Sequence, residues 1–245
     1  MKKFCKLSLI IIISVSVIFS LSACFPFGGT APEPTPTEDP NATPAPAKVS
    51  DIEFKMFDSS DFKISYQPKW HLYDRNEFNK NVKDEDIKKE RETYADIWDK
   101  DEIRTLAIIS ETNLNDYLKG EKERAEVAEL GPSITIDKLQ LDSTEQEKFK
   151  LKEYVEDSVK DLKQSVGNFT FLKDFREIEL KSGDKAYEFE YIGEVQGLPD
   201  IAVKQIISYK NGCIYIVIYM TTYQKYNDKN YTAVMAKTLE SFELK

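Results

Sequence analysis

The feature that most constrains the fold is a run from Cys213 to Thr221 that is apolar or aromatic on both faces. Isoleucines and a methionine at 214, 216, 218 and 220 alternate with Tyr215, Val217 and Tyr219. A strand with this pattern must be covered on both sides to keep its side chains from water. The run therefore predicts a central strand in a layered domain.

Three further strands are predicted just before it. Tyr187, Phe189 and Tyr191 alternate with two glutamates, and Ile201–Tyr209 places Val203 and Ile207 on one face. Asn211-Gly212 is a strong hairpin signal between the last two strands. Turn sequences at Ser182-Gly183-Asp184 and Gly197-Leu-Pro199-Asp200 separate the others, the first of which is Arg176–Lys181. These segments together predict a four-stranded antiparallel meander.

Helices are expected on both sides of this meander. Thr144-Glu-Gln-Glu147 has the spacing of a capping box. After it, apolar residues recur at helical spacing, and a second such stripe lies near the C-terminus; we expect both to face the core. The two stripes are Leu151, Val155, Val159, Leu162 and Val166, and Tyr231, Val234, Met235, Thr238 and Phe242.

The N-terminal part adds strands at Ile52–Phe57, Phe62–Tyr66 and Arg104–Glu111 and a helix at Leu114–Leu130. The predicted fold class is α+β: a single antiparallel sheet of roughly six or seven strands flanked by helices, in an α/β/α layered sandwich. The domain spans 51–245, which is long enough to form one hydrophobic core.

Asp61-Phe-Lys-Ile-Ser-Tyr-Gln-Pro-Lys-Trp70 resembles the opening of PsbP-like and Mog1-like domains, where a strand runs into a proline and then a tryptophan. The later order of helix, meander and final helix ending in Ser241-Phe242 is similar too. Lipoproteins of Gram-positive bacteria carry such domains. The resemblance implies a fold, and no activity or cofactor follows from it.

A charged segment from Asn76 to Glu102 departs from the compact family pattern and is predicted as an insertion between the second and third strands. Sixteen of its 27 residues are charged, with Tyr94 and Trp98 among its few large apolar side chains. We expect a surface helix with one face on the sheet. The alternative is an arm that presents Tyr94 and Trp98 to a partner, because long insertions are often functional.

The first 23 residues have the composition of a signal peptide: lysines at 2, 3 and 6, an apolar run, and small residues before Cys24. The run is shorter than the roughly 20 residues of a membrane span. Leu21-Ser-Ala-Cys24 resembles the lipobox of bacterial lipoproteins. The resemblance implies that Cys24 becomes the lipidated N-terminus, which anchors the chain to the cell membrane on the extracytoplasmic side.

The segment that follows, up to Ser50, holds seven of the ten prolines and almost no large apolar residue. Such a sequence cannot bury enough surface to fold. An extended polyproline conformation over Thr30–Lys48 would reach about 60 Å. Residues 24–50 are therefore predicted to be a lipidated, disordered stalk.

Charge and composition exclude several function classes. The net charge is −9, and removal of the three signal-peptide lysines lowers it to −12, which argues against nucleic acid as a partner. His71 is the only histidine, and Cys213 lies in the central strand, so neither a catalytic triad nor a zinc site is expected. Acidic runs such as Asp84-Glu-Asp86 lack the spacing of calcium loops.

No cofactor is expected, and the leading hypothesis is a non-enzymatic binding or assembly module at the cell envelope. Its partner would be another envelope protein or a small ligand, and the domain itself is expected to be monomeric. Two alternatives stay open. One is an envelope hydrolase that uses carboxylates on the sheet, and the other is the solute-binding lipoprotein of a transporter.

Overall fold

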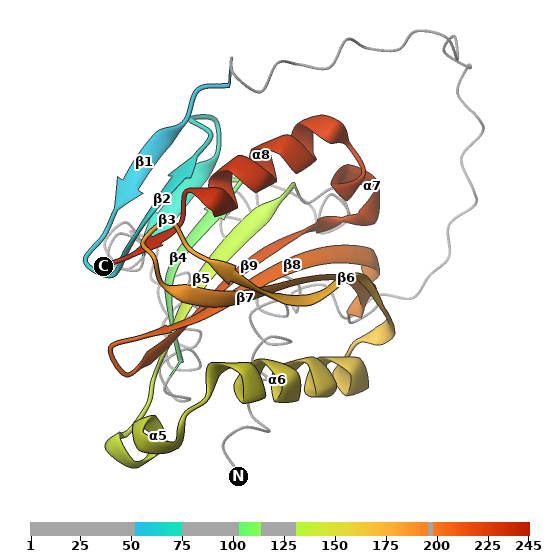
Figure 1. The fold of residues 1–245 in the computed structure, drawn as a ribbon. Helices are drawn as coiled ribbons and strands as arrows, with labels where there is room; N and C mark the ends of the chain where they lie inside the picture. The colour runs from blue at the N-terminus through green and yellow to red at the C-terminus, as the bar shows by residue number, and fades with distance from the viewer. Residues whose placement is uncertain (1–51, 75–102, 114–130, 196–197) are drawn as a thin grey trace, which may run out of the picture.

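The structure, a computed structural model, describes residues 52–74, 103–113, 131–195 and 198–245. In this part of the chain seven strands form one antiparallel sheet, and helices lie on both of its sides (Figure 1). The predicted α+β fold class is confirmed.

The strand order in the large sheet is β3-β4-β5-β9-β8-β7-β6, and each neighbouring pair is antiparallel. The last four strands in sequence also follow one another in space, as the predicted meander requires. The strands are His71–Asp74 (β3), Ile103–Ser110 (β4), Ser133–Gln140 (β5), Gly167–Glu179 (β6), Lys185–Val195 (β7), Leu198–Lys210 (β8) and Cys213–Thr222 (β9).

The tight turns of the meander use residues with positive φ. Asn211 and Gly212 have φ values of 51° and 78° and connect β8 to β9, as in a type I′ hairpin. Gly183, with a φ of 81°, lies between β6 and β7. Residues without a Cβ, or with a short polar side chain, adopt this region at least cost. The predicted third turn lies partly outside the described residues.

The central strand β9 is buried on both faces, as its sequence predicts. Ile214, Ile216 and Ile218 pack into the core on the side of α6 (Leu151–Ser165). Tyr215 and Val217 belong to the core on the side of α8 (Lys229–Glu240). The sheet therefore separates two apolar cores.

The α6 stripe is confirmed, but the start of the helix differs from the prediction. Asp142 accepts a hydrogen bond from the Glu145 amide at 2.9 Å, and the Glu145 carboxylate accepts one from the Asp142 amide at 3.0 Å. This capping box begins a separate short helix, α5 (Ser143–Lys148), two residues before the predicted one. Extended backbone at Phe149 (ψ 131°) then separates α5 from α6.

Helix α8 and the short helix α7 (Tyr223–Tyr226) lie on the other side of the sheet from α6 (Figure 1). The buried residues of α8 are Val234, Met235, Thr238 and Leu239, and Phe242 is buried just beyond its end. Four of the five residues of the predicted C-terminal stripe are therefore buried, and Tyr231 is half-buried.

A second, three-stranded sheet corrects the prediction of a single sheet. Its order is β1-β2-β10, with β1 at Lys55–Asp58, β2 at Phe62–Tyr66 and β10 at Glu243–Leu244. The amide of Lys245 donates to the Asp61 carbonyl at 3.0 Å. A two-residue strand that pairs across the whole domain leaves no local pattern, which is why the sequence did not reveal it.

Two strands of the large sheet, β3 and β5, were not predicted, and β6 begins at Gly167 rather than at Arg176. The segment 76–102 therefore follows the third strand, not the second. That segment and the predicted helix at 114–130 lie outside the described residues.

Candidate functional site

The sheet face toward α6 is apolar in one half and polar in the other. Over β7, β8 and β9 it is almost entirely apolar, and α6 packs on β6, β7 and β8. Over β4 and β5 the same face carries hydroxyl and carboxyl groups. This polar half-face consists of Thr105, Ser110, Ser133, Thr135 and Asp137, none of them more than 8% exposed.

Strand alternation on β5 explains the split. Ile134 and Ile136 enter the core on the α8 side, which turns Thr135 and Asp137 toward the α6 side. In the cross-strand register, Asp137 lies between Thr105 on β4 and Ile216 on β9. The polar half-face thus continues directly into the apolar half.

Among the aspartates and glutamates of the described residues, Asp137 stands out by a raised pKa. Its side chain accepts a hydrogen bond from the Thr105 hydroxyl at 2.7 Å, and the residue is 3% exposed. Burial raises the pKa of its carboxyl to about 7, against a smaller lowering by the Thr105 hydrogen bond. In the described ranges, no lysine or arginine forms an ion pair with Asp137.

Gln205 is a second polar group on this face, within the apolar half. It is fully buried, and its register neighbours are Ile218 on β9 and Phe189 on β7. Among the described residues, neither its amide oxygen nor its amide nitrogen has a hydrogen-bond partner. A buried polar group without a partner costs about 1–3 kcal/mol, so Gln205 is not explained by core packing.

The opposite face of β6, β7 and β8 holds a set of ion pairs that we name the charged row: Lys173, Arg176, Glu188, Glu190 and Lys204. The Lys204 ammonium lies 2.7 Å from Glu188 and 3.2 Å from Glu190. Arg176 Nε donates to Glu188 at 2.7 Å, and Lys173 contacts Glu190 at 3.1 Å. Each glutamate therefore has two cationic partners.

Hydrogen bonds to the two glutamates decide their protonation. Burial alone would raise the pKa of Glu188, but hydrogen bonds from Lys204 and Arg176 outweigh it and hold the pKa below its usual value. For Glu190 the same burial is outweighed by hydrogen bonds from Tyr226 and Lys173. Both glutamates are thus carboxylates at neutral pH, which suits a structural network better than a general acid.

The described residues provide no carboxylate pair in which one member could act as a general acid. Glu188 and Glu190 lie close together around Lys204, but the pKa of each is lowered. Such a pair needs two carboxyl groups roughly 5–9.5 Å apart. Asp137 and the charged row lie on opposite faces of the sheet. In the cross-strand row of Asp137, the next carboxylate is Glu177 on β6, four strands away or about 19 Å.

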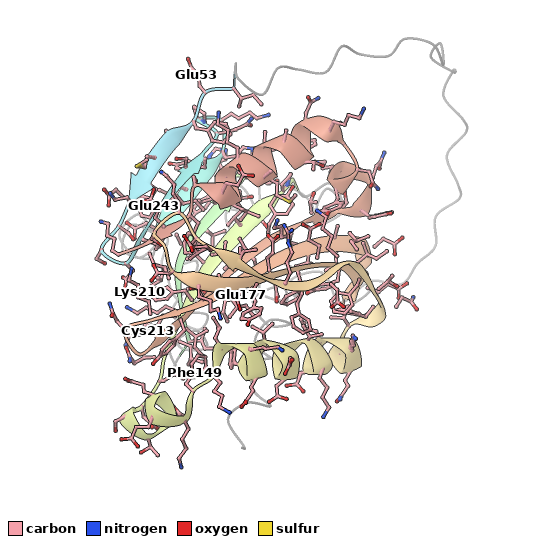
Figure 2. The ribbon with its side chains drawn as sticks, viewed as in Figure 1. Glu53, Phe149, Glu177, Lys210, Cys213 and Glu243 are labelled. Atoms are coloured by element: carbon pink, nitrogen blue, oxygen red, sulfur yellow. The ribbon has the colours of Figure 1, made fainter. Side chains whose placement is uncertain are left out.

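The sites predicted from sequence have different outcomes. Cys24, Tyr94 and Trp98 lie outside the described residues. His71 is exposed at the start of β3. Cys213 is buried near Lys210 at the β8–β9 hairpin (Figure 2), its thiol 2.9 Å from the Gln140 amide oxygen, and burial raises its pKa. A thiol with a raised pKa is a poor nucleophile, as expected for a core cysteine.

The described ranges hold neither a cluster of metal-binding side chains nor a membrane-spanning helix. No three histidine, cysteine, aspartate or glutamate side chains gather there as a metal site would require. No helix in the same ranges is long and apolar enough to cross a membrane.

Neither Asp137 nor Gln205 was identified from the sequence. Asp137 alternates with two isoleucines, which is also the pattern of a strand with one solvent-facing side. Gln205 did leave a signal, because it stands between Val203 and Ile207 on the face predicted to be apolar.

No protein-family model matches the chain, and no curated protein matches it. Similar solved structures include a cyanobacterial PsbP from Synechocystis sp. PCC 6803, with 9% identity, 84% of this chain and 100% of that chain covered, and a TM-score of 0.44. The Saccharomyces cerevisiae Ran-binding protein Mog1p gives 10% identity, 79% and 96% coverage, and a TM-score of 0.43.

LpqN of Mycobacterium tuberculosis, described as involved in cell envelope biogenesis, gives 11% identity, 79% and 91% coverage, and a TM-score of 0.41. PsbP and Mog1 are thus among the structures similar to this chain, as the sequence resemblance suggested. At this level of similarity the α+β class rests on the strands and helices themselves.

Proposed function

We propose that this chain is a lipoprotein anchored to the extracytoplasmic side of the cell membrane, with a non-enzymatic binding module as its folded domain. The Leu21-Ser-Ala-Cys24 sequence supports attachment through lipid on Cys24. The proline-rich segment after it supports a stalk that carries the domain away from the bilayer.

The polar half-face is the observation that carries the binding role. Small-ligand sites combine an apolar lining with a few well-placed polar groups. Here one buried carboxyl and four hydroxyls adjoin the apolar half of the same sheet face. The nearest carboxylate in the row of Asp137 is too distant to act with it. This arrangement favours recognition of a small ligand over acid–base turnover.

The anchor is tested by metabolic labelling with a palmitate analogue in cells that express the full chain. We expect wild type to be labelled and to sediment with membranes, and Cys24→Ala to be neither. Cys5→Ala is the matched control, because its cysteine would leave with the signal peptide, and it should behave as wild type. Undiminished labelling of Cys24→Ala would overturn the anchoring proposal.

The binding role is tested by thermal unfolding of the purified full chain against a library of small polar compounds, followed by NMR of each compound. We expect compounds of one chemical class to raise the unfolding temperature of wild type but not that of Asp137→Asn. The NMR spectra should show that these compounds are not converted. Asp157→Asn, an exposed position on α6, is the control. Conversion of a compound by wild type would instead indicate an enzyme.

A further inference from the structure

The charged row contains more positive charge than its two glutamates require. Lys204 contacts both Glu188 and Glu190 and is itself mostly buried, with 13% of its side chain exposed. Lys173 and Arg176 add two further positive charges from β6. The row therefore has a net positive charge, in a chain whose net charge is −9.

The positive charges form the outer layer of this row. The side chains of Lys173 and Arg176 are 62% and 69% exposed, whereas those of Glu190 and Glu188 are 2% and 9% exposed. Despite their burial, hydrogen bonds from neighbouring side chains keep the pKa of both glutamates below its usual value. A partner that approaches this face therefore meets a lysine and an arginine, each held from below by a carboxylate.

The irregular pairing of β6, which forms one edge of the large sheet (Figure 1), places both cations on one face. Lys173 and Arg176 are three residues apart, and on a regular strand such residues point to opposite faces. A register shift between them brings Lys173 opposite Glu190 and Arg176 opposite Glu188. Bulges of this kind re-aim side chains and are over-represented at sheet edges and next to functional sites.

The spacing of the two cations matches that of side chains on an extended polypeptide. Their register partners Glu188 and Glu190 are two residues apart on β7, which corresponds to about 6.8 Å between Cα atoms. In an extended peptide, side chains two residues apart point to the same face at this same interval. Two acidic side chains with one residue between them would therefore reach both cations at once.

We infer that Lys173 and Arg176 form a docking surface for an extended acidic segment of a partner protein. Two carboxylates of this segment, separated by one residue, bind the ammonium group of Lys173 and the guanidinium group of Arg176. The guanidinium has five N–H donors, and its bonds to Glu188 through Nε and Nη2 use two of them. The surface lies on the face opposite the polar half-face, so the inference goes beyond the proposed small-ligand site.

Charge complementarity favours an acidic partner although the chain itself is acidic. At physiological salt, charges more than about 8 Å away are largely screened, so an approaching segment responds mainly to the exposed cations next to it. A planar guanidinium also matches a planar carboxylate, which it binds through two parallel hydrogen bonds. These contacts are made by side chains, so the register shifts of β6, which hinder backbone pairing, are compatible with them.

Two peptides of identical composition test the spacing. Each consists of serine, threonine and two glutamates, which are two positions apart in one peptide and adjacent in the other. Both are titrated at low salt into the isotope-labelled full chain, and NMR follows the Nε–H signal of Arg176 and the amides of β6. We expect saturable shifts, with the alternating peptide bound roughly two- to fivefold more tightly. A third peptide, with glutamines in place of the glutamates, should produce no shifts.

Variants separate docking from the structural role of the ion pairs. Arg176→Gln and Lys173→Gln should each remove the preference for the alternating peptide, whereas Lys160→Gln, exposed on α6, should keep it. Asp174→Asn leaves the ion pairs of the charged row in place and removes an exposed acid between the two cations in sequence. It should bind the alternating peptide about twofold more tightly or better, which tests the surface even if Arg176→Gln fails to fold.

The outcomes that would overturn the inference are distinct. Equal affinity for the alternating and the adjacent peptide would exclude recognition of an extended segment. Saturable shifts with inorganic phosphate but with neither peptide would indicate a phosphate-bearing partner instead. No shift of the Arg176 signal with either acidic peptide at millimolar concentration would exclude the docking surface. The thermal-unfolding screen with Asp137→Asn concerns the opposite face, so the proposed small-ligand site is tested separately.

Discussion

Single residues decide how much of the site can be predicted from the sequence. Gln205 interrupts an apolar face whose other members, Val203 and Ile207, fit the expected core. Its position is therefore visible in the strand pattern. The role of Asp137 is not visible, because its alternation with Ile134 and Ile136 fits a strand whose second face is either solvent-exposed or buried. Only the tertiary structure shows that both sides of β5 are buried.

Replacing Gln205 by leucine is expected to raise the free energy of unfolding of the ligand-free chain by about 1–2 kcal/mol. The reason is that the change removes two unpaired polar atoms and keeps the volume. Gln140→Leu is the contrasting variant, because the Gln140 amide donates to the Gly212 carbonyl at 3.1 Å. It should lose about 1 kcal/mol. Urea unfolding measures both, and a loss of stability in Gln205→Leu would show that its amide has a partner.

At the level of elements, the sequence predicts strands with strong patterns and misses those defined by distant pairing. β9 is correctly predicted because both of its faces are apolar, and the meander because its turns carry glycine and asparagine. β10 has two residues and depends on β2, nearly the whole domain away in sequence. The break between α5 and α6 arises from extended backbone at Phe149, where no proline or glycine marks it.

Strand β8 joins the two sites, because its residues alternate between the faces. Gln205 points toward α6, whereas Lys204 points to the charged row. Lys204→Met should cost about 3–5 kcal/mol of unfolding free energy, since two buried glutamates lose their shared cation. Lys160→Met, exposed on α6, is the control and should change little. A loss below about 1 kcal/mol would mean that Arg176 and Lys173 suffice.

Strand β6 forms one edge of the large sheet and carries three register irregularities along its pairing with β7. Bulges and charged side chains on edge strands hinder pairing with a second chain. These features disfavour edge-to-edge pairing through β6, and the monomeric domain stays a prediction.

At the scale of the whole molecule, the layered order of the fold places different chemistry on each side of one sheet. In the described part of the chain, one face pairs its buried Glu188 and Glu190 with lysine and arginine, and the other holds the buried Asp137 beside hydroxyls. Fold class and layers follow from hydrophobic periodicity, which the sequence displays. The site follows from which polar residues of distant strands become neighbours, which periodicity does not encode.

The burial of the Asp137 carboxyl is tested most directly by the free energy of unfolding of wild type and Asp137→Asn, measured between pH 5 and pH 8. Burial raises the pKa of Asp137 from 3.8 to about 7, so the folded state keeps a proton that the unfolded state releases. Wild-type stability should therefore fall by about 1.4 kcal/mol per pH unit up to pH 7 and then level off. Asparagine has no such proton.

Asp137→Asn should thus gain about 3 kcal/mol relative to wild type between pH 5 and pH 8, while Asp157→Asn tracks wild type throughout. A difference between Asp137→Asn and wild type that is independent of pH, or that turns in favour of wild type as the pH rises, would contradict the account. Either result would show that Asp137 is not a buried carboxyl in need of a counter-charge.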